Sequence, residues 1–188
     1  MLGPILRSDK ARLEPPRLED MPTYLSWRRM PEVSHFLWGP PSVSSLRQQE
    51  EWFDRVARAE DEIAWRIVVD DRTVGRASIF GIDWLNCGGE TSTVIGDPSL
   101  WRRGIGTTVV RLRCGYAFEE LGLERLETIS LVENIGMHRA LERSGYRNLT
   151  RLHRFVFRQG RWHDVYLFEM LRSDWRAQYD SRLTPHQP

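Results

Sequence analysis

The stretch GDPSLWRRGIGTTVVRLRCGYAFEELGL, residues Gly96 to Leu123, joins an apolar run to a helical pattern through the seven residues WRRGIGT. Apolar residues then recur on one helical face, at Val110, Cys114, Ala117, Phe118 and Leu121. This spacing predicts a helix from about Gly106 to Glu120, closed by Gly122 as a left-handed cap. The first N–H groups of a helix have no intrahelical partner, and glycines let a phosphate approach them. We therefore expect the loop to bind a phosphate ester or a pyrophosphate.

Two well-known phosphate loops differ from this one. A P-loop requires a lysine followed by Ser or Thr after its second glycine, but Gly106 is followed by Thr107 and Thr108. The dinucleotide fingerprint requires a third small residue where Val109 stands, and the strands predicted before the loop form a meander instead of a crossover unit. Neither class of nucleotide-binding protein is favoured.

Composition limits the kind of protein. A chain of 188 residues predicts a single domain, and its formal net charge of +1 provides no overall field for nucleic acid or an anionic membrane. Cys87 and Cys114 lie far apart without ligand-like spacing, so we expect neither a disulfide framework nor a metal site. The N-terminal MLGPILRSDK does not read as a signal peptide, and no apolar span is long enough for a membrane helix. We expect a soluble, cytoplasmic protein.

The first half of the chain predicts one strand, two helices and a three-stranded meander. Pro15 and Pro16 end a short strand in ARLEPPRLED. Pro31 ends a helix over MPTYLSWRR, and Ser45 with Gln48 forms a capping box before a helix in QQEEWFDRVARAED. The meander consists of IAWRIVV, RTVGRASIFGIDWL and ETSTVIG.

The second half adds one strand, one short helix and a hairpin to the helix that follows the loop. The strand is RLETISLV, the helix lies in NIGMHRALERSGYR, and the hairpin turns on Gln159-Gly160. We place the domain at residues 10–172, with terminal tails at 1–9 and 173–188, and we expect the polar C-terminal tail to fray.

These segments, in this order, resemble a known family. WRRGIG is similar to the Q/R-x-x-G-x-G/A loop of the GNAT superfamily of acyl-CoA N-acyltransferases, with Trp101 where Gln or Arg is commoner. YAFEELGLERLE, NIGMHRALERSGYR and FRQGRWHDV resemble the subgroup of ribosomal-protein N-terminal and spermidine acetyltransferases. The resemblance spans about Leu13 to Arg172 and is most specific over 90–165.

The resemblance implies an α/β (α+β) single domain with a mixed, mostly antiparallel seven-stranded sheet and about four helices. In this family the sheet splays between its fourth and fifth strands, where the co-substrate acetyl-CoA inserts. The implied cofactor-binding residues are Val94, Ile95 and Gly96 along the pantetheine, Trp101, Arg102, Arg103, Gly104, Ile105, Gly106 and Thr107 at the pyrophosphate loop, and Asn134 at the pantetheine arm.

Each of these residues also has a purely structural interpretation. Gly104 and Gly106 could form only a tight turn, but a cap alone does not call for Gly-x-Gly and two arginines. Arg102 and Arg103 could be solvated, and Asn134 could be only the N-cap of its helix. Sequence alone leaves these alternatives open.

Acetyl transfer to an amine sets further chemical requirements. An alkyl ammonium, with a pKa of about 10, must lose a proton before it attacks the thioester. By resemblance, Glu90 leads this proton away through water, although it could equally be a solvent-facing strand residue. A backbone N–H near Ile95, freed by the splay, would bind the oxyanion. Leu141 stands where many members have a tyrosine acid, but a thiol of pKa about 8.5 leaves without much help. His153 and His163 read as structural histidines.

The acceptor is predicted from the segment WRRMPEVSHFLWGPP, which overhangs the acyl end in the family layout. Glu32 is its only acid, too few for a polyamine. We expect a peptide N-terminus or an amino-bearing small molecule, with Trp27, Arg28, His35 and Trp38 at the mouth, although the tryptophans could equally be packing residues. Two alternatives stay open, a polyamine or aminoglycoside acetyltransferase and a non-catalytic acyl-CoA-binding regulatory module. A homodimer is also left open.

Overall fold

One mixed sheet organises the residues that this computed structural model describes, 1–37 and 45–183, with side chains described as far as 178. Within those residues the sheet has eight strands in the order β1-β2-β3-β4-β5-β6-β8-β7. All neighbouring strands are antiparallel except β5 and β6, which are parallel. The mixed, mostly antiparallel sheet predicted from the sequence is confirmed.

The elements have the following bounds. The strands are β1 (Leu6–Arg7), β2 (Arg12–Glu14), β3 (Ile63–Val69), β4 (Arg72–Asp83), β5 (Gly88–Ile95), β6 (Arg125–Leu131), β7 (Arg147–Arg158) and β8 (Arg161–Leu171). The α-helices are α1 (Met21–Arg29), α2 (Pro31–Ser34), α3 (Leu46–Arg58), α4 (Ile105–Gly115), α5 (Ile135–Ser144) and α6 (Arg172–Leu183). A π-helical turn, Tyr116–Glu120, continues α4.

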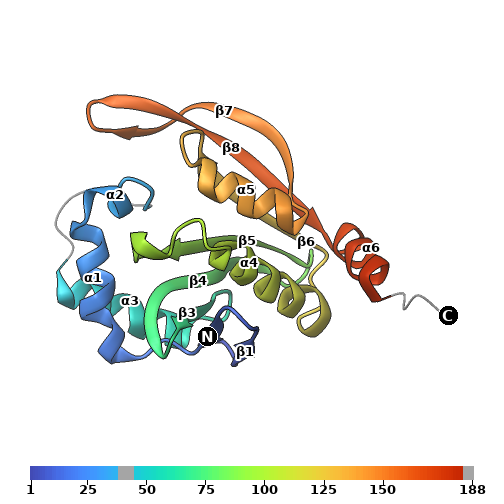
Figure 1. Cartoon of the computed structure of the whole chain (residues 1–188), viewed down its shortest axis with the longest axis horizontal. Coiled ribbons are helices and arrows are strands. Elements are labelled where there is room, and N and C mark those ends of the chain that lie inside the picture. Colours follow the sequence, from blue (N-terminus) through green and yellow to red (C-terminus); the bar gives the residue numbers. More distant parts are fainter. Residues whose placement is uncertain (38–44, 184–188) are drawn as a thin grey trace.

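Helices cover both faces of the sheet (Figure 1). Each face also has its own hydrophobic core. Ile95 of β5 packs against the larger core, to which α4 and α5 contribute. Its neighbour Val94 packs against a smaller core of α1 and α2 residues, because successive strand side chains point to opposite faces. The hairpin of β7 and β8 extends beyond this body, and its tip lies near α2 in Figure 1.

Several local signals behave as the sequence predicts. Ser45 and Gln48 form the capping box of α3. Gly122 follows its helix with φ of +70°, in the left-handed region that favours glycine. Gln159 and Gly160 turn the hairpin, both with positive φ.

The expected seven strands and about four helices are corrected to eight strands and six α-helices in the described part of the chain. The extra strand, β1, has two residues, too few to show an alternating pattern. The four-residue α2 begins at Pro31, which we interpreted only as the end of α1. Proline is also favoured at the first position of a helix, so it marks both boundaries here.

Both expected tails include ordered structure. β1 pairs with β2, and the Gly3 amide donates to the Ala64 carbonyl at 2.9 Å. At the other end, α6 replaces the fraying segment that its polar composition suggested. Trp175 anchors it, with its ring 6.1 Å from that of Phe118 and packed against the larger core.

Candidate active site

The sheet opens between β5 and β6. Their parallel ladder has three registered pairs, and the last one joins Glu90 to Glu127. β5 continues to Ile95 and β6 to Leu131, but the two strands do not pair with each other beyond this point. The splay that the family resemblance implied therefore lies here, and we call the opening the fork.

Two threonines close the fork immediately after the last backbone pair. The Thr91 hydroxyl donates to the Glu127 carbonyl at 3.1 Å, and the Thr128 hydroxyl donates to the Thr91 carbonyl at 2.8 Å. Side chains thus satisfy backbone groups that the separating strands leave behind. The Thr91 hydroxyl is also 3.3 Å from the hydroxyl of buried Tyr146, so the base of the fork is fixed from the α4–α5 side.

The edge of β5 that faces the fork presents the Ile95 amide. The Gly96 amide donates to Val74 of β4 at 2.8 Å, and the direction of backbone N–H groups alternates along a strand. The Ile95 N–H therefore points away from β4, on the edge where the ladder with β6 has ended. The Ile95 carbonyl on the same edge accepts from Trp101 Nε1 at 2.9 Å.

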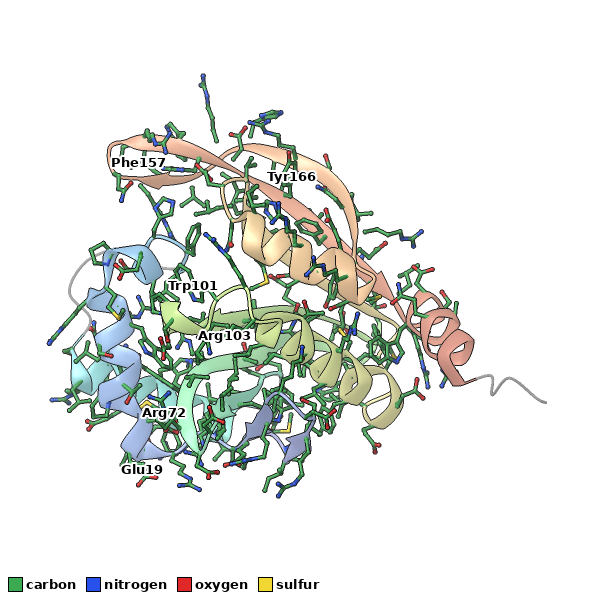
Figure 2. The ribbon with its side chains drawn as sticks, viewed as in Figure 1. Glu19, Arg72, Trp101, Arg103, Phe157 and Tyr166 are labelled. Carbon is green, nitrogen blue, oxygen red and sulfur yellow. The ribbon has the colours of Figure 1, made fainter. Side chains whose placement is uncertain are left out.

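The loop before α4 has the geometry of an anion site. Arg102 and Gly104 have φ of +64° and +83°, and Gly104 is the N-cap. The first backbone bond of the helix runs from the Thr108 amide to the Gly104 carbonyl, so the amides of residues 105–107 precede it. Arg102 and Arg103 are exposed beside them, and Figure 2 labels Arg103 near the start of α4. Ile105 is buried, so it can offer only its backbone.

Lys10, which the sequence analysis did not select, belongs to the same site. A Cβ built on Gly104 would lie 3.4 Å from Lys10 Nζ. The lysine is exposed in the link between β1 and β2, ninety-four positions before the loop. A cation at a helix N-terminus is unfavourable unless an anion lies between them, because the helix dipole is positive there. Sequence separation hides this contact from any local pattern.

Buried polar groups support β5 from beneath. Arg113 of α4 is 1% exposed, and its Nη1 donates to the Ser92 carbonyl at 2.5 Å and the Thr93 hydroxyl at 2.7 Å. Tyr146 accepts from the Cys114 thiol at 3.6 Å, and burial together with the charge of Cys114 raises its pKa. Leu141 lies in the core at 1% exposure. Leu141 cannot donate a proton at the position where the family resemblance implied a tyrosine acid.

Asn134 follows β6 on the other side of the fork. Its Oδ1 accepts from the Met137 amide at 3.2 Å, which makes it the N-cap of α5. The structural interpretation of Asn134 is thus realised, and the cap uses the oxygen of the amide.

The predicted acceptor residues lie on the α1–α2 face. Trp27 is 6% exposed, and a Cβ on Gly96 would overlap its ring at 2.0 Å, so this tryptophan packs on the glycine backbone. Arg28 and His35 are half-buried. Trp38 lies outside the described residues. Arg158 of β7 donates to the His35 carbonyl at 2.5 Å and to the Leu37 carbonyl, and so ties this segment to the hairpin.

Three arginines of this face lie close enough to influence one another. Arg76 of β4 lies over the rings of Tyr24 and Trp52, at 5.9 and 5.1 Å from their centroids. Burial lowers the pKa of Arg76, and the charge of Arg28 lowers it further. Burial and the charge of Arg28 also lower the pKa of Arg158. The charge of Arg28 therefore lowers the pKa of both Arg76 and Arg158.

Glu90 is exposed at the closed end of the fork. It is even-numbered like Val94, so its side chain points to the α1–α2 face of β5. Five positions separate it from Ile95, about 16 Å along an extended strand. A proton from the open end of the fork would therefore need intervening water to reach this carboxylate.

Comparison with known proteins agrees with this geometry. Residues 10–147 match the model of the acetyltransferase (GNAT) domain. Probable N-acetyltransferase YjcK of Bacillus subtilis (strain 168) is 34% identical over 108 residues, which cover 56% of this chain and 58% of the relative. The alignment thus spans little more than half of that curated protein.

Solved structures share the fold. A spermidine N-acetyltransferase from Vibrio cholerae, in complex with CoA and spermine, matches with TM-score 0.82 and 18% identity over 90% of this chain and 99% of its own. A GCN5-related N-acetyltransferase from Brucella melitensis matches with TM-score 0.75 and 24% identity over 96% and 86%. The chain belongs to the GNAT family of acetyltransferases, a class of acyltransferase enzymes. No helix in the described residues is long and apolar enough to cross a membrane.

Proposed function

We propose that this protein binds acetyl-CoA in the fork and transfers the acetyl group to a primary amine by direct attack. The observation that carries the proposal is the end of the β5–β6 ladder at Glu90, with the glycine loop at the far end of β5. An extended pantetheine can pair with the free edge of β5, and a pyrophosphate can lie on the amides at the start of α4. Lys10, Arg102 and Arg103 supply the matching charge.

Acetyl-CoA supplies an activated acyl group, and the residues of this chain supply its orientation and charge stabilisation. The Ile95 N–H is a fixed donor for the negative charge that develops on the carbonyl oxygen, because it is not committed to the ladder. Arg113 of α4 and the hydroxyls of Thr91 and Thr128 hold β5 in place by hydrogen bonds. Glu90 leads a proton to solvent through water. Leu141 leaves the departing thiolate to take its proton from the surroundings.

The acceptor is a single amine on an apolar, aromatic or anionic body, such as a peptide N-terminus or an amino-bearing metabolite. Arg28, Arg76 and Arg158 on the α1–α2 face favour this class, because like charges repel a polyamine. The half-buried ring of Trp52, which packs edge-on against buried Tyr24, offers apolar surface nearby. Likeness to a spermidine acetyltransferase at 18% identity concerns the fold and does not determine the acceptor.

Calorimetry with acetyl-CoA and a thiol-release assay test the proposal in two stages. We expect micromolar binding of acetyl-CoA, followed by CoA release with alanine-led peptides or phenethylamine ahead of spermidine and kanamycin. Well-folded protein that gives no heat with acetyl-CoA would refute the proposal. Binding without turnover of any amine would favour the non-catalytic module, and faster turnover of spermidine would overturn only the acceptor class.

A further inference from the structure

A histidine that reads as structural in the sequence lies between the two halves of the proposed site. His163 is the third residue of β8, and its side chain is fully buried. Its Nδ1 is 2.7 Å from Glu133 Oε1, in the link between β6 and α5. Its ring centre is 5.9 Å from that of His35, which belongs to the segment expected at the acceptor mouth. Glu133 directly precedes Asn134, which the resemblance assigns to the pantetheine arm.

The hydrogen bond to Glu133 determines which ring nitrogen is the base. Burial raises the pKa of Glu133, but the His163 hydrogen bond and nearby positive charges outweigh burial and leave the pKa lowered. An ionised carboxylate only accepts, so His163 Nδ1 donates, and in the neutral ring Nε2 then carries the lone pair. Among the described residues, Nε2 is buried and has no hydrogen-bond partner. A buried polar atom without a partner costs free energy and calls for an explanation.

The surroundings of the imidazole are mixed in charge. Glu133 approaches Nδ1 from the β6–α5 link, and Arg161 of β8 lies 3.8 Å from the same carboxylate. His35, the C-cap of α2, packs against the ring. Arg158 of β7 holds the His35 carbonyl, and Arg28 of α1 acts on Arg158. Glu133 is 39% exposed on its side chain, so it links the buried imidazole to solvent.

We propose that His163, oriented by Glu133, is a catalytic base that takes the proton of the acceptor ammonium at Nε2. The step converts R–NH3⁺ and neutral imidazole into R–NH2 and imidazolium, and the free amine then attacks the thioester carbonyl. The nitrogen loses a second proton as the C–S bond breaks, and this proton neutralises the departing thiolate. The imidazolium then loses the Nε2 proton to water, which leads it toward Glu90, while Nδ1 keeps its proton and its hydrogen bond to Glu133.

This inference rests on the proposed acetyl transfer and adds a group at the acceptor side of the fork. Glu90 stands about 16 Å along β5 from Ile95, whereas His163 contacts the acceptor segment itself. His163 therefore receives the proton first, and Glu90 provides an exit at the closed end. Histidine is also the side chain that most often acts as a general base in enzymes.

The hairpin provides a matched control for this test. His153 on β7 also has its Nδ1 2.9 Å from a carboxylate, that of Asp164, but it is exposed and lies away from His35. We would compare His163→Gln, Glu133→Gln and His153→Gln with the wild type. The measurements are acetyl-CoA affinity by calorimetry and kcat/KM across pH for an alanine-led tripeptide, phenethylamine and spermidine.

We expect His163→Gln to lower kcat/KM by about 100- to 1000-fold with acetyl-CoA affinity within about twofold, and to remove the fall in rate toward acid pH that protonation of the imidazole causes. Glu133→Gln should lower kcat/KM about 10-fold and move that acid limb to lower pH, since an amide supports the imidazolium less than a carboxylate does. His153→Gln should stay within about twofold.

Three results would overturn the inference without touching the proposed function. One is a His163→Gln variant that keeps the wild-type rate and pH profile. If that variant does not fold, an unchanged Glu133→Gln acid limb has the same meaning. If no amine turns over, the ¹⁵N resonance of His163 Nε2 is followed while the three amines are added to CoA-bound protein, and an unmoved resonance rejects the assignment. Failure of the wild type to bind acetyl-CoA would instead refute the proposed function.

Discussion

The two ends of the fork are built in different ways. The proposed cofactor end consists mostly of one continuous stretch, from Val94 to Thr107, to which Lys10 and Asn134 add distant contributions. The acceptor end brings together His35, Glu133 and the 158–163 hairpin tip, which are distant in sequence. A continuous site should be sensitive to backbone changes at single positions. An assembled site should respond to loss of the side chains that join its parts. Substitutions at the cofactor end should therefore lower acetyl-CoA affinity, and substitutions at the acceptor end should lower kcat/KM.

The largest effect is expected for Gly104→Asp at the cofactor end. An L-residue is strained at φ of +83°. An Asp carboxylate there would repel the pyrophosphate, and it would pair with the Lys10 ammonium, which would then no longer be available to the pyrophosphate. We expect the affinity for acetyl-CoA to fall by about 100-fold or more, measured by calorimetry, because both effects oppose binding.

Gly160→Asp is the matched control, since this glycine has φ of +73° with no atom within 4 Å of a built Cβ. It carries the same backbone strain and the same charge away from the loop. Equal loss of acetyl-CoA binding in both variants would mean that strain or misfolding, and not the phosphate site, explains the result.

Glu90→Gln should have the next largest effect, and it tests the closed end of the fork. The substitution keeps the shape of an exposed side chain but removes its charge. We expect kcat/KM to fall by about 10- to 100-fold, the lower range for loss of general base catalysis, with little change in acetyl-CoA affinity. The check is the pH–rate profile for phenethylamine. An unaltered profile would make Glu90 an ordinary strand residue and leave proton removal to the acceptor end.

The same contrast explains what the sequence could predict. Gly104, Gly106 and the helical spacing after them act through neighbours in the chain, so the loop and α4 follow from local rules. His163 could not be assigned in this way, because its burial depends on α2 and its orientation depends on Glu133, thirty positions earlier. Trp27 shows the opposite case: an aromatic residue expected at the acceptor mouth packs mainly on the backbone of Gly96. Contacts between residues distant in sequence determine the positions of both His163 and Trp27.

The splay was predicted from family resemblance and not from strand patterns. Nothing in the spacing of ETSTVIG or RLETISLV indicates where pairing stops. In the structure the Thr91 and Thr128 hydroxyls terminate the ladder by taking over backbone partners. Threonine is common in strands in general, so this role appears only when the two strands are seen side by side.

A smaller effect is expected at Lys10, a distant member of the cofactor end. Lys10→Ala removes one exposed charge beside Gly104 without altering the loop backbone. We expect about a fivefold loss of acetyl-CoA affinity at low salt, which shrinks as ionic strength rises and screening shortens the reach of the charge. Arg7→Ala, an exposed cation of β1, is the control. Identical salt dependence in wild type and Lys10→Ala would exclude Lys10 from the phosphate site.

The smallest expected effect concerns the outer face of the hairpin, where Asp164 shapes the strand that carries His163. Its carboxylate accepts from the Arg154 amide at 2.8 Å, from His153 Nδ1 at 2.9 Å and from Arg151 Nε at 2.8 Å. Arg154 has φ of +49° within the irregular register of β7.

These contacts, led by the Arg154 amide, lower the pKa of Asp164 to about 2. A carboxyl group with a lowered folded-state pKa stabilises the protein above its unfolded pKa of about 3.9, and the contribution is lost as pH falls through the folded value. Asp164→Asn should therefore lower the thermal midpoint slightly at neutral pH, and the difference from the wild type should narrow between about pH 4 and pH 2. Acetyl-CoA affinity should not change, since the fork is built from other strands. A difference in midpoint that stays constant over this range would show that Asp164 holds the hairpin by shape and not by charge.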